Sequence, residues 1–397
     1  MNRATIVRGI QLIVAITLVT FTYLLVDSIH TQKEGLATGL AHLHVGYLVI
    51  GALLALQEGV LGGLRIYVLA RVLSRDIRVR TAIVSEFVLM FCAGVTPGQA
   101  GAAPSQVAVL VTGGMRIVDV ATAEMLVALS TVTFFLASGL LVFILRAKGL
   151  MVVAQDGAHI DFLLGLSVVA FGSIFLALVL CAAYPPLLKV VVRALAPPLG
   201  AVYRALLRLV RRISRFRIWA DNALDKPGAV RDRLLQSVDE LNAGFRIYLR
   251  RGKAAFLTSL LITFFFFFAR FAVAYFILLG LGLPTTPSSF VTIGPPIVQV
   301  VLVQTLLNFA LYLSPTPGAS GVAEAASTAM MRPWVTGPYE LPYLVLWRVL
   351  ALFLGMFVGG VYVFRYLGTD VLEARIKENE KAKAELHPHG GASSSAL

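Results

Sequence analysis

The chain has 397 residues, of which 58 % are hydrophobic and 14 % charged, and its mean hydropathy is +0.83. Soluble domains carry roughly 25 % charged residues, so this composition excludes a soluble globular enzyme and indicates an integral membrane protein. The net charge of +13 is concentrated, because residues 185–253 hold 15 Lys and Arg against 5 Asp and Glu. Cys92 and Cys181 lie in apolar segments and indicate neither a disulfide framework nor a metal cluster.

Long apolar runs predict about six transmembrane helices, since a span needs roughly 20 apolar residues. In chain order the predicted spans are 10–29, 45–69, 117–145, 162–184, 254–281 and 341–364. No A-x-A-like cleavage site follows the first run, so we expect a helix there and not a signal peptide.

Two shorter apolar stretches are interrupted by the same motif, TPGxxG, once at residues 96–101 and again at 316–321. Proline and glycine break a regular helix, and such breaks are tolerated at membrane depth only inside protein or beside a polar cavity. Matching breaks in two halves predict a site between two re-entrant hairpins, although two unrelated loop turns are the alternative. The predicted hairpin tips are Thr96, Pro97, Gly98 and Gly101, and Thr316, Pro317, Gly318 and Gly321.

The basic loops at 71–80 and 185–253 predict the orientation, because positively charged loops stay in the cytoplasm. The first hairpin would then start and end on the cytoplasmic side of the membrane. The second hairpin would start and end on the outer side if the C-terminal tail is cytoplasmic. The predicted fold is an all-α polytopic membrane protein, with helix–hairpin–helix units at about 45–145 and 254–364 in an inverted repeat. We expect a transmembrane domain over 1–365, a polar and partly disordered cytoplasmic tail over 366–397, and a cytoplasmic N-terminus.

The basic loop, about residues 187–253, carries one strongly amphipathic stretch. Its arginines on one helical face are Arg204, Arg208, Arg211, Arg212 and Arg215. Such a helix is typical of an anionic membrane surface. A cytosolic helical hairpin is the alternative, because a second apolar stripe runs from Val230 to Phe245 at helical spacing.

Ionisable side chains inside spans cost roughly 2.5–3.5 kcal/mol each and are therefore functional candidates. These residues are Glu58, Arg65, Glu86, Glu124, Arg270, Glu324 and Arg348. We expect all but Glu86 to bind substrate, since arginines from both repeats could hold a lipid phosphate with their planar forks. The alternative is that these residues pair with one another only to hold the hairpins in place.

Several catalytic motifs are missing from the sequence: HExxH, a P-loop, GxGxxG, GxSxG and an Asp-x-Asp pair. We therefore expect no cofactor, no metal, no catalytic residue and no nucleic-acid partner. The expected partners are membrane lipids with anionic or polar headgroups.

Thr96 to Pro104, with Gly114 and Ala123-Glu124 after it, resembles the first signature of the flippase-like membrane family. That family includes the transmembrane region of lysylphosphatidylglycerol synthase and the bacterial YbhN-type proteins. Pro315 to Glu324, followed by Trp347-Arg348, is similar to its second signature. Ala102 and Ala319 depart from the family pattern, in which glycine is common.

The resemblance covers about residues 10–365 and implies a bacterial inner-membrane protein that moves or handles amphipathic lipids. Only about 30 residues follow the membrane part here. We therefore do not expect an aminoacyl-lipid synthase, whose soluble transfer domain would follow it. Two alternatives stay open: an intramembrane transferase with Glu124 or Glu324 as base, and a non-catalytic partner of an enzyme in a lipid, hopanoid or glycolipid pathway.

Overall fold

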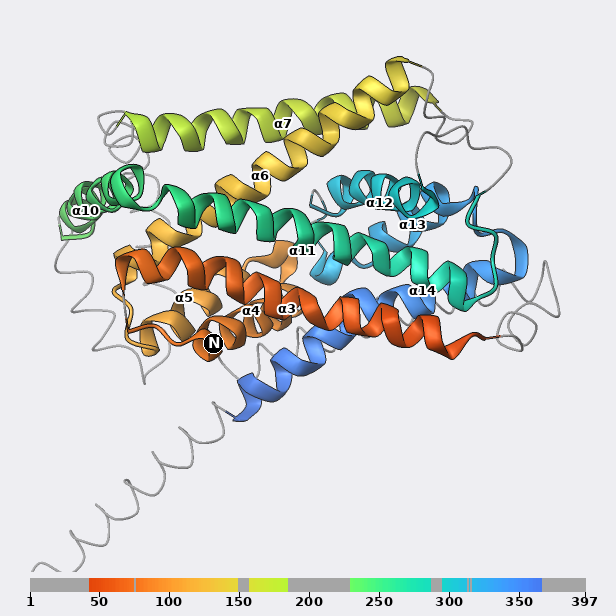
Figure 1. Cartoon of the computed structure of the whole chain (residues 1–397), viewed down its shortest axis with the longest axis horizontal. Helices are drawn as coiled ribbons and strands as arrows, with labels where there is room; N and C mark the ends of the chain where they lie inside the picture. Colours follow the sequence, from red (N-terminus) through yellow and green to blue (C-terminus); the bar gives the residue numbers. More distant parts are fainter. Residues whose placement is uncertain are drawn as a thin grey trace, which may run out of the picture.

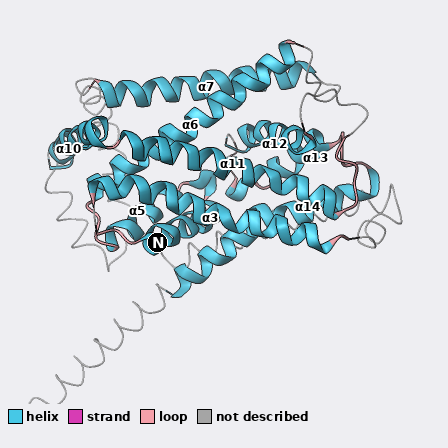
Figure 2. Ribbon diagram, in the orientation of Figure 1, coloured by secondary structure: helices cyan, strands magenta, loops and turns pink. Residues whose placement is uncertain are grey.

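The computed structural model describes residues 43–74, 76–148, 157–184, 229–286, 295–312, 314 and 316–365. Within these ranges the regular structure is helical throughout, without a strand (Figure 2). The helices of the first half are α3 (Val45–Leu73), α4 (Val79–Val95), η1 (Pro97–Gln99), α5 (Ala102–Thr112), α6 (Ile117–Ala147) and α7 (Gly157–Ala183). Those of the second half are α10 (Ala229–Arg251), α11 (Lys253–Gly280), α12 (Pro296–Tyr312), η3 (Pro317–Ala319), α13 (Val322–Met331), η4 (Gly337–Tyr339), α14 (Glu340–Arg348) and the π-helical turn η5 (Val349–Phe353).

Among the described residues, four helices are long and apolar enough to cross a membrane: Val45–Leu73, Ile117–Leu145, Lys253–Gly280 and Gly337–Arg365. They correspond to four of the six predicted spans. Helix α7 occupies the place of the span predicted at 162–184, and the span predicted at 10–29 lies outside the described residues. The last span begins earlier than predicted, because η4 places Pro338 in its first turn, where the missing N–H costs nothing.

Helices α3 and α11 form the antiparallel centre of the bundle (Figure 1). The backbone N–H of His44, just before α3, donates to the carbonyl of Gly280 at the end of α11, at 2.8 Å. A phenylalanine cluster between α6, α11 and α12 explains the aromatic run at 264–268. Phe134 stacks on Phe267 with ring centroids 4.6 Å apart, and Phe135 lies 5.3 Å from Phe309.

Two helical hairpins enter this bundle from opposite ends (Figure 1). Hairpin 1 comprises α4, η1 and α5, and Thr81 at its start lies against Gly113 at its end. Hairpin 2 comprises α12, η3 and α13, and it opens toward the end of α11, where the Trp334 indole donates to the Thr285 carbonyl at 2.9 Å. The two tips, η1 and η3, contact each other inside the bundle.

Helix α4 lies very close to its neighbours on two sides, because glycines face it there. A Cβ added at Gly63 of α3 would overlap the backbone of Ile83, and one at Gly359 of the last helix would overlap the carbonyl of Phe87. Small residues let helix backbones approach closely in membrane proteins. Hairpin 1 is therefore held between α3 and the helix that ends at Arg365.

Helix α10 packs on the end of the bundle where α3 ends. Phe245 and Tyr248 are buried against that end, and the Tyr248 hydroxyl donates to the carbonyl of Leu69. Burial raises the pKa of the Tyr248 phenol above its usual value, so the phenol remains a donor. The second apolar stripe therefore contributes Phe245 to a contact with the bundle. The predicted basic face at 204–215 lies outside the described residues, so both the membrane-surface helix and the cytosolic hairpin stay predictions.

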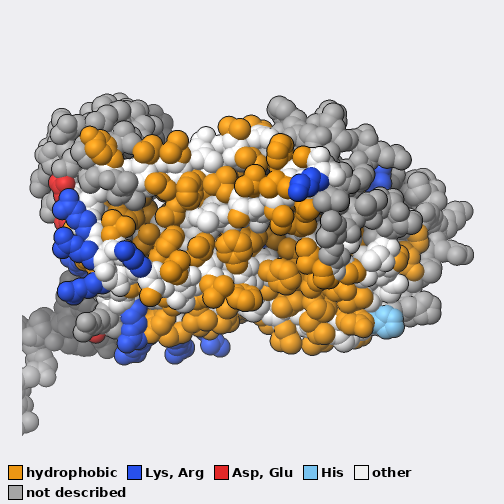
Figure 3. Space-filling view, turned by 45° about the horizontal axis from the view of Figure 1, so that its top comes forward, with side chains coloured by type: hydrophobic (Ala, Val, Ile, Leu, Met, Phe, Trp, Pro, Cys, Tyr) orange, Lys and Arg blue, Asp and Glu red, His pale blue; other side chains and the backbone are white. Residues whose placement is uncertain are grey.

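Positive charge gathers at this same end of the molecule. Figure 3 shows most Lys and Arg side chains at one end and along the adjoining edge, with a broad hydrophobic surface between the ends. Exposed arginines here are Arg71, Arg78, Arg80, Arg116, Arg250 and Arg251.

Candidate functional site

The two TPGxxG tips share a backbone conformation at three of their motif positions. Thr96 and Thr316 are extended, with ψ of 140° and 150°. The glycine after the proline and the residue that follows it are left-handed in both copies, with φ of 55° and 57° at Gly98 and Gln99 and 57° and 55° at Gly318 and Ala319. The last motif glycines differ, since φ is −82° at Gly101 and 87° at Gly321, so the two breaks share their first turn but not their exit into the next helix.

Non-glycine residues in the left-handed region cost roughly 1–2 kcal/mol each, so both tips require fixed partners. In tip 1, the Thr96 hydroxyl donates to the Cys92 carbonyl at 2.6 Å and accepts from the Gly101 N–H at 2.8 Å. Gly98, Gln99 and the following Ala100 are exposed. A single hydroxyl group therefore joins the two ends of tip 1.

Tip 2 is held by an arginine and a glutamate. Arg348 Nη1 donates to the carbonyl of Gly318 at 2.9 Å, and Nη2 lies 3.5 Å from the carbonyl of Ala319. Its Nε donates to Glu324 at 2.6 Å, while the second Glu324 oxygen accepts from the Gly321 N–H at 2.6 Å. The carboxylate lies in the first turn of α13, where the helix dipole favours negative charge.

The Arg348–Glu324 pair is almost fully buried, with side-chain exposures of 4 % and 1 %. Its donors and acceptors are directed at the tip itself. The predicted binding residues Glu324 and Arg348 therefore form a clamp on tip 2, as in the alternative that these ions hold the hairpins. The π-helical turn η5 directly follows Arg348, and such turns are frequent at functional sites.

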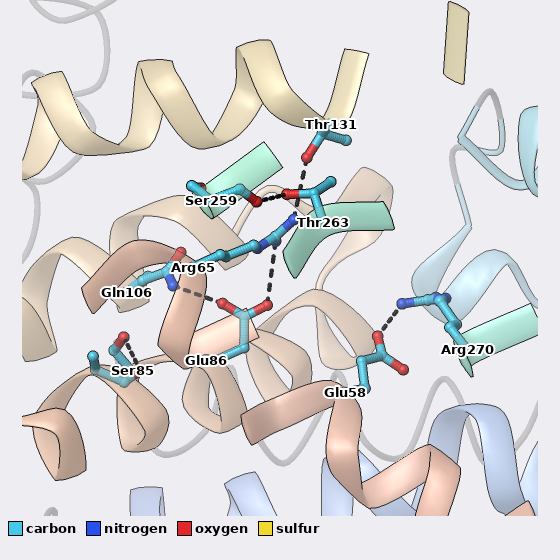
Figure 4. A network of polar contacts seen from close by, with 10 residues as sticks. Glu58, Arg65, Ser85, Glu86, Gln106, Thr131, Ser259, Thr263 and Arg270 are labelled. Carbon is cyan, nitrogen blue, oxygen red and sulfur yellow. Dashed lines mark hydrogen bonds and ion pairs between the residues drawn. The ribbon is translucent and has the colours of Figure 1, made fainter. Parts of the chain in front are cut away.

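A second polar network joins helices α3, α4, α5 and α6 in the first half of the chain (Figure 4). Arg65 of α3 lies 3.5 Å from the Glu86 carboxylate of α4 and donates to the Thr131 hydroxyl of α6 at 3.2 Å. The other Glu86 oxygen accepts from Gln106 of α5 at 2.9 Å. The Arg65 guanidinium also lies 4.5 Å from the ring centroid of Phe266 on α11, a cation–π contact.

The Glu58–Arg270 ion pair lies beside this network and joins α3 to α11 (Figure 4). Glu58 is two helical turns from Arg65, and Arg270 is one turn from Phe266. The two ion pairs, Arg65–Glu86 between α3 and α4 and Glu58–Arg270 between α3 and α11, therefore form one row along α3, which we call the central charge row. The side chain of Arg270 is 33 % exposed, whereas that of Glu58 is 5 % exposed, so the row reaches the protein surface at Arg270.

Arg65 is held less completely than Arg348. Its Nε is buried and has no hydrogen-bond partner among the described residues, and its contact with Glu86 is long. Buried donors are normally satisfied, so this one leaves Arg65 with spare capacity for hydrogen bonding. Glu124 of α6 has a buried Oε1 that likewise lacks a partner within the described ranges.

The structure separates five of the six predicted binding residues into two groups, and Glu124 belongs to neither. Arg65, Arg270 and Glu58 belong to the central charge row, whereas Glu324 and Arg348 belong to the clamp on tip 2. Arg65 pairs with Glu86 and Arg270 pairs with Glu58, so the two arginines do not form a single unpaired cationic site. Glu86 was among the ionisable candidates but not among the predicted binding residues, although it pairs with Arg65. Gln106 and Thr131 were in neither set, because neutral side chains inside apolar stretches give no comparable signal.

A family model described as the lysylphosphatidylglycerol synthase TM region matches residues 10–359. The chain belongs to this family. The match includes both hairpins, the central charge row and the clamp on tip 2. A comparison with curated proteins gives no match. Membership of the lysylphosphatidylglycerol synthase TM region family identifies a multi-pass membrane domain involved in lipid processes.

Proposed function

We propose that this chain is a lipid flippase or transporter of the bacterial cytoplasmic membrane. The observation that carries the proposal is the meeting of two hairpins from opposite ends, tip to tip, inside a bundle that contains the central charge row. Helix breaks that meet within an inverted repeat are typical of transporter binding sites. Family membership supports a role with lipids.

The proposed topology places the arginine-rich end of the molecule in the cytoplasm, because positive loops are retained there. Hairpin 1 would then be re-entrant from the cytoplasmic side and hairpin 2 from the outer side. The six spans would comprise the four candidate helices, α7 and residues 10–29, with both chain termini inside.

The proposed mechanism passes a polar headgroup along the central charge row while the acyl chains stay in the bilayer. A headgroup entering hydrocarbon loses its hydration, so a path needs fixed charges and donors to replace water. Arg270 is partly exposed and could exchange its Glu58 partner for a lipid phosphate. The spare Nε of Arg65 provides the next donor along the row.

The test is lipid translocation by the full chain in sealed vesicles, measured as loss of accessible fluorescent phospholipid from one leaflet. We expect the parent chain to accelerate translocation over protein-free vesicles. Arg270→Gln should reduce the rate by at least about tenfold, since a charge-assisted contact is worth about 1.5–3 kcal/mol. Arg332→Gln is the matched control, because Arg332 is exposed and outside the row.

A charge-swapped chain, Glu58→Arg with Arg270→Glu, separates structure from transport. Ion pairing is possible in either orientation, so the swap should recover the thermal stability that Arg270→Gln loses. It should not recover translocation, because a carboxylate would occupy the exposed position. Full translocation by both variants, or no acceleration by the parent, would show that the proposal is wrong.

A further inference from the structure

A groove of about 840 Å³ runs along hairpin 1 on the side away from Glu86. This volume lies within the roughly 300–1,000 Å³ typical of ligand sites. One wall is a stripe of α4 side chains at helical spacing, Val84, Val88 and Cys92. The other walls come from α5, through Pro104, Ser105, Ala108 and Val109, and from the last helix, through Tyr362 and Val363. The groove is therefore mainly apolar.

One end of the groove is cationic. Arg78 and Arg80 line it at the start of α4, and Arg365 lines it at the end of the last helix. Thr81 and Gly113 line it as well and lie against each other, which places the first two arginines at the open end of hairpin 1. The lining includes no Asp or Glu. The groove therefore combines a positive entrance with apolar walls.

The other end of the groove reaches tip 1. Cys92 and Gly101 line it there, and these are the two residues that the Thr96 hydroxyl joins. A molecule that fills the groove would extend from the arginines to the backbone of the hairpin tip.

We propose that this groove binds one anionic phospholipid of the surrounding membrane, with its phosphate at Arg78, Arg80 and Arg365 and an acyl chain along α4 and α5. Guanidinium groups match phosphate geometry, and arginines near a membrane surface attract anionic lipids. An acyl chain suits the apolar walls, whereas a peptide segment would leave its backbone N–H and C=O groups without partners there.

This inference rests on the proposed function and deepens it, because it assigns the charge class of the lipid and the place where it binds before transfer. The entrance lies at the arginine-rich end, so the lipid is taken from the leaflet on that side. Its acyl chain would contact tip 1 directly, while its headgroup stays at the entrance.

The experiment uses the full chain in nanodiscs that contain a phosphatidylglycerol with a photoreactive acyl chain. Mass spectrometry should locate adducts at residues 84–92 and 104–109. Unlabelled phosphatidylglycerol should suppress these adducts at least fivefold more strongly than phosphatidylcholine does. Arg78→Gln with Arg80→Gln should reduce adduct formation by about tenfold.

Two further variants control the experiment. Arg250→Gln with Arg251→Gln removes the same charge at the end of α10, outside the groove, and should keep the parent level. Ala108→Trp fills the groove from an exposed position of α5 without changing its charge, and should abolish the adducts.

Adducts spread evenly over the apolar surface, or suppressed equally by both lipids, would overturn the inference. Cross-links from the groove to another segment of the chain would also overturn it, because that segment would then be the occupant. Translocation without groove adducts would overturn this inference and leave the proposed function standing. Groove adducts without translocation would support lipid binding in the groove and overturn the proposed function.

Discussion

The two hairpin tips have the same motif and the same left-handed backbone at its third and fourth positions, but they are held in different ways. Tip 2 is clamped by Arg348 and Glu324, and its Pro317, Ala319 and Ser320 are buried. Tip 1 is exposed at Gly98, Gln99 and Ala100, and the Thr96 hydroxyl joins its two ends, while the Gln99 N–H donates to the Thr96 carbonyl at 3.2 Å. A similar turn is therefore held by a buried ion pair in one half and by a hydroxyl group and a backbone hydrogen bond in the other.

This difference suits a division of roles within the proposed transporter. The clamped tip 2 would provide a fixed surface, and the exposed tip 1, which the groove reaches, would rearrange against it. Elements that move are drawn from the parts of a protein with few buried contacts, which describes tip 1 but not the closely packed α4. Substitutions at equivalent positions of the two tips can break or sharpen this comparison.

The largest effect is expected for Arg348→Gln. It leaves Glu324 buried without its cation and removes the donors to the Gly318 and Ala319 carbonyls. The free energy of unfolding should therefore fall by about 5 kcal/mol. Thermal unfolding in mild detergent measures the change. Arg332→Gln, at an exposed position just after α13, should leave the transition where it is. An unchanged transition for Arg348→Gln would mean that tip 2 is not clamped.

A smaller loss is expected for Glu86→Gln, which weakens the connection between hairpin 1 and α3. Arg65 loses its carboxylate partner but keeps Thr131, and the new amide can still accept a hydrogen bond from Gln106. We therefore expect the free energy of unfolding to fall by about 2–3 kcal/mol. Glu124→Gln is the matched control, because its buried Oε1 has no partner among the described residues to lose. A greater loss for Glu124→Gln than for Glu86→Gln would contradict the network.

Thr96→Val should lower the free energy of unfolding by about 1–2 kcal/mol, because it removes two hydrogen bonds in a nearly isosteric change. Thr316→Val should cost less, since the Arg348 clamp remains. Hydrogen exchange of the tip amides provides the local measurement, and Gly101 should exchange faster in the Thr96 variant. Equal acceleration at both tips would remove the asymmetry on which the comparison rests.

The smallest effects are expected for alanine at the tip glycines. Both residues are left-handed, so each substitution costs about 1 kcal/mol. A Cβ at Gly98 meets nothing within 4 Å, whereas one at Gly318 would lie 3.2 Å from Leu352. Gly318→Ala should therefore lower the unfolding temperature more than Gly98→Ala. The opposite order would indicate that tip 1 is the more tightly packed of the two.

Much of the architecture could be predicted from the sequence, because apolar length and helix breakers are local signals. The four described spans and both helix breaks lie where these signals indicated. The motif did not reveal that Gln99 and Ala319 adopt left-handed backbone, since nothing in either side chain requires it. At Ala319, where glycine is common in the family pattern, Arg348 Nη2 lies 3.5 Å from the carbonyl.

The pairing of the charged residues could not be predicted, because it depends on how helices cross. Glu58 and Arg270 meet only because α3 and α11 are antiparallel neighbours, and they are 212 residues apart. The sequence equally allowed Arg65 and Arg270 to share one phosphate. Neutral Gln106 and Thr131 became visible only when the hairpin brought them to Glu86 and Arg65.

Gly63 and Gly359 have a mechanical consequence for hairpin 1. The backbones at Ile83 and Phe87 lie against these two glycines, so α4 has no room for sideways displacement toward either neighbour. Side chains also interlock along the helix axis, because Phe87 and Met90 of α4 fill the space over Gly59 and Gly355 of the two neighbours. Such interlocking resists sliding. Any movement of α4 against its neighbours must therefore first displace these side chains from the glycines that they cover.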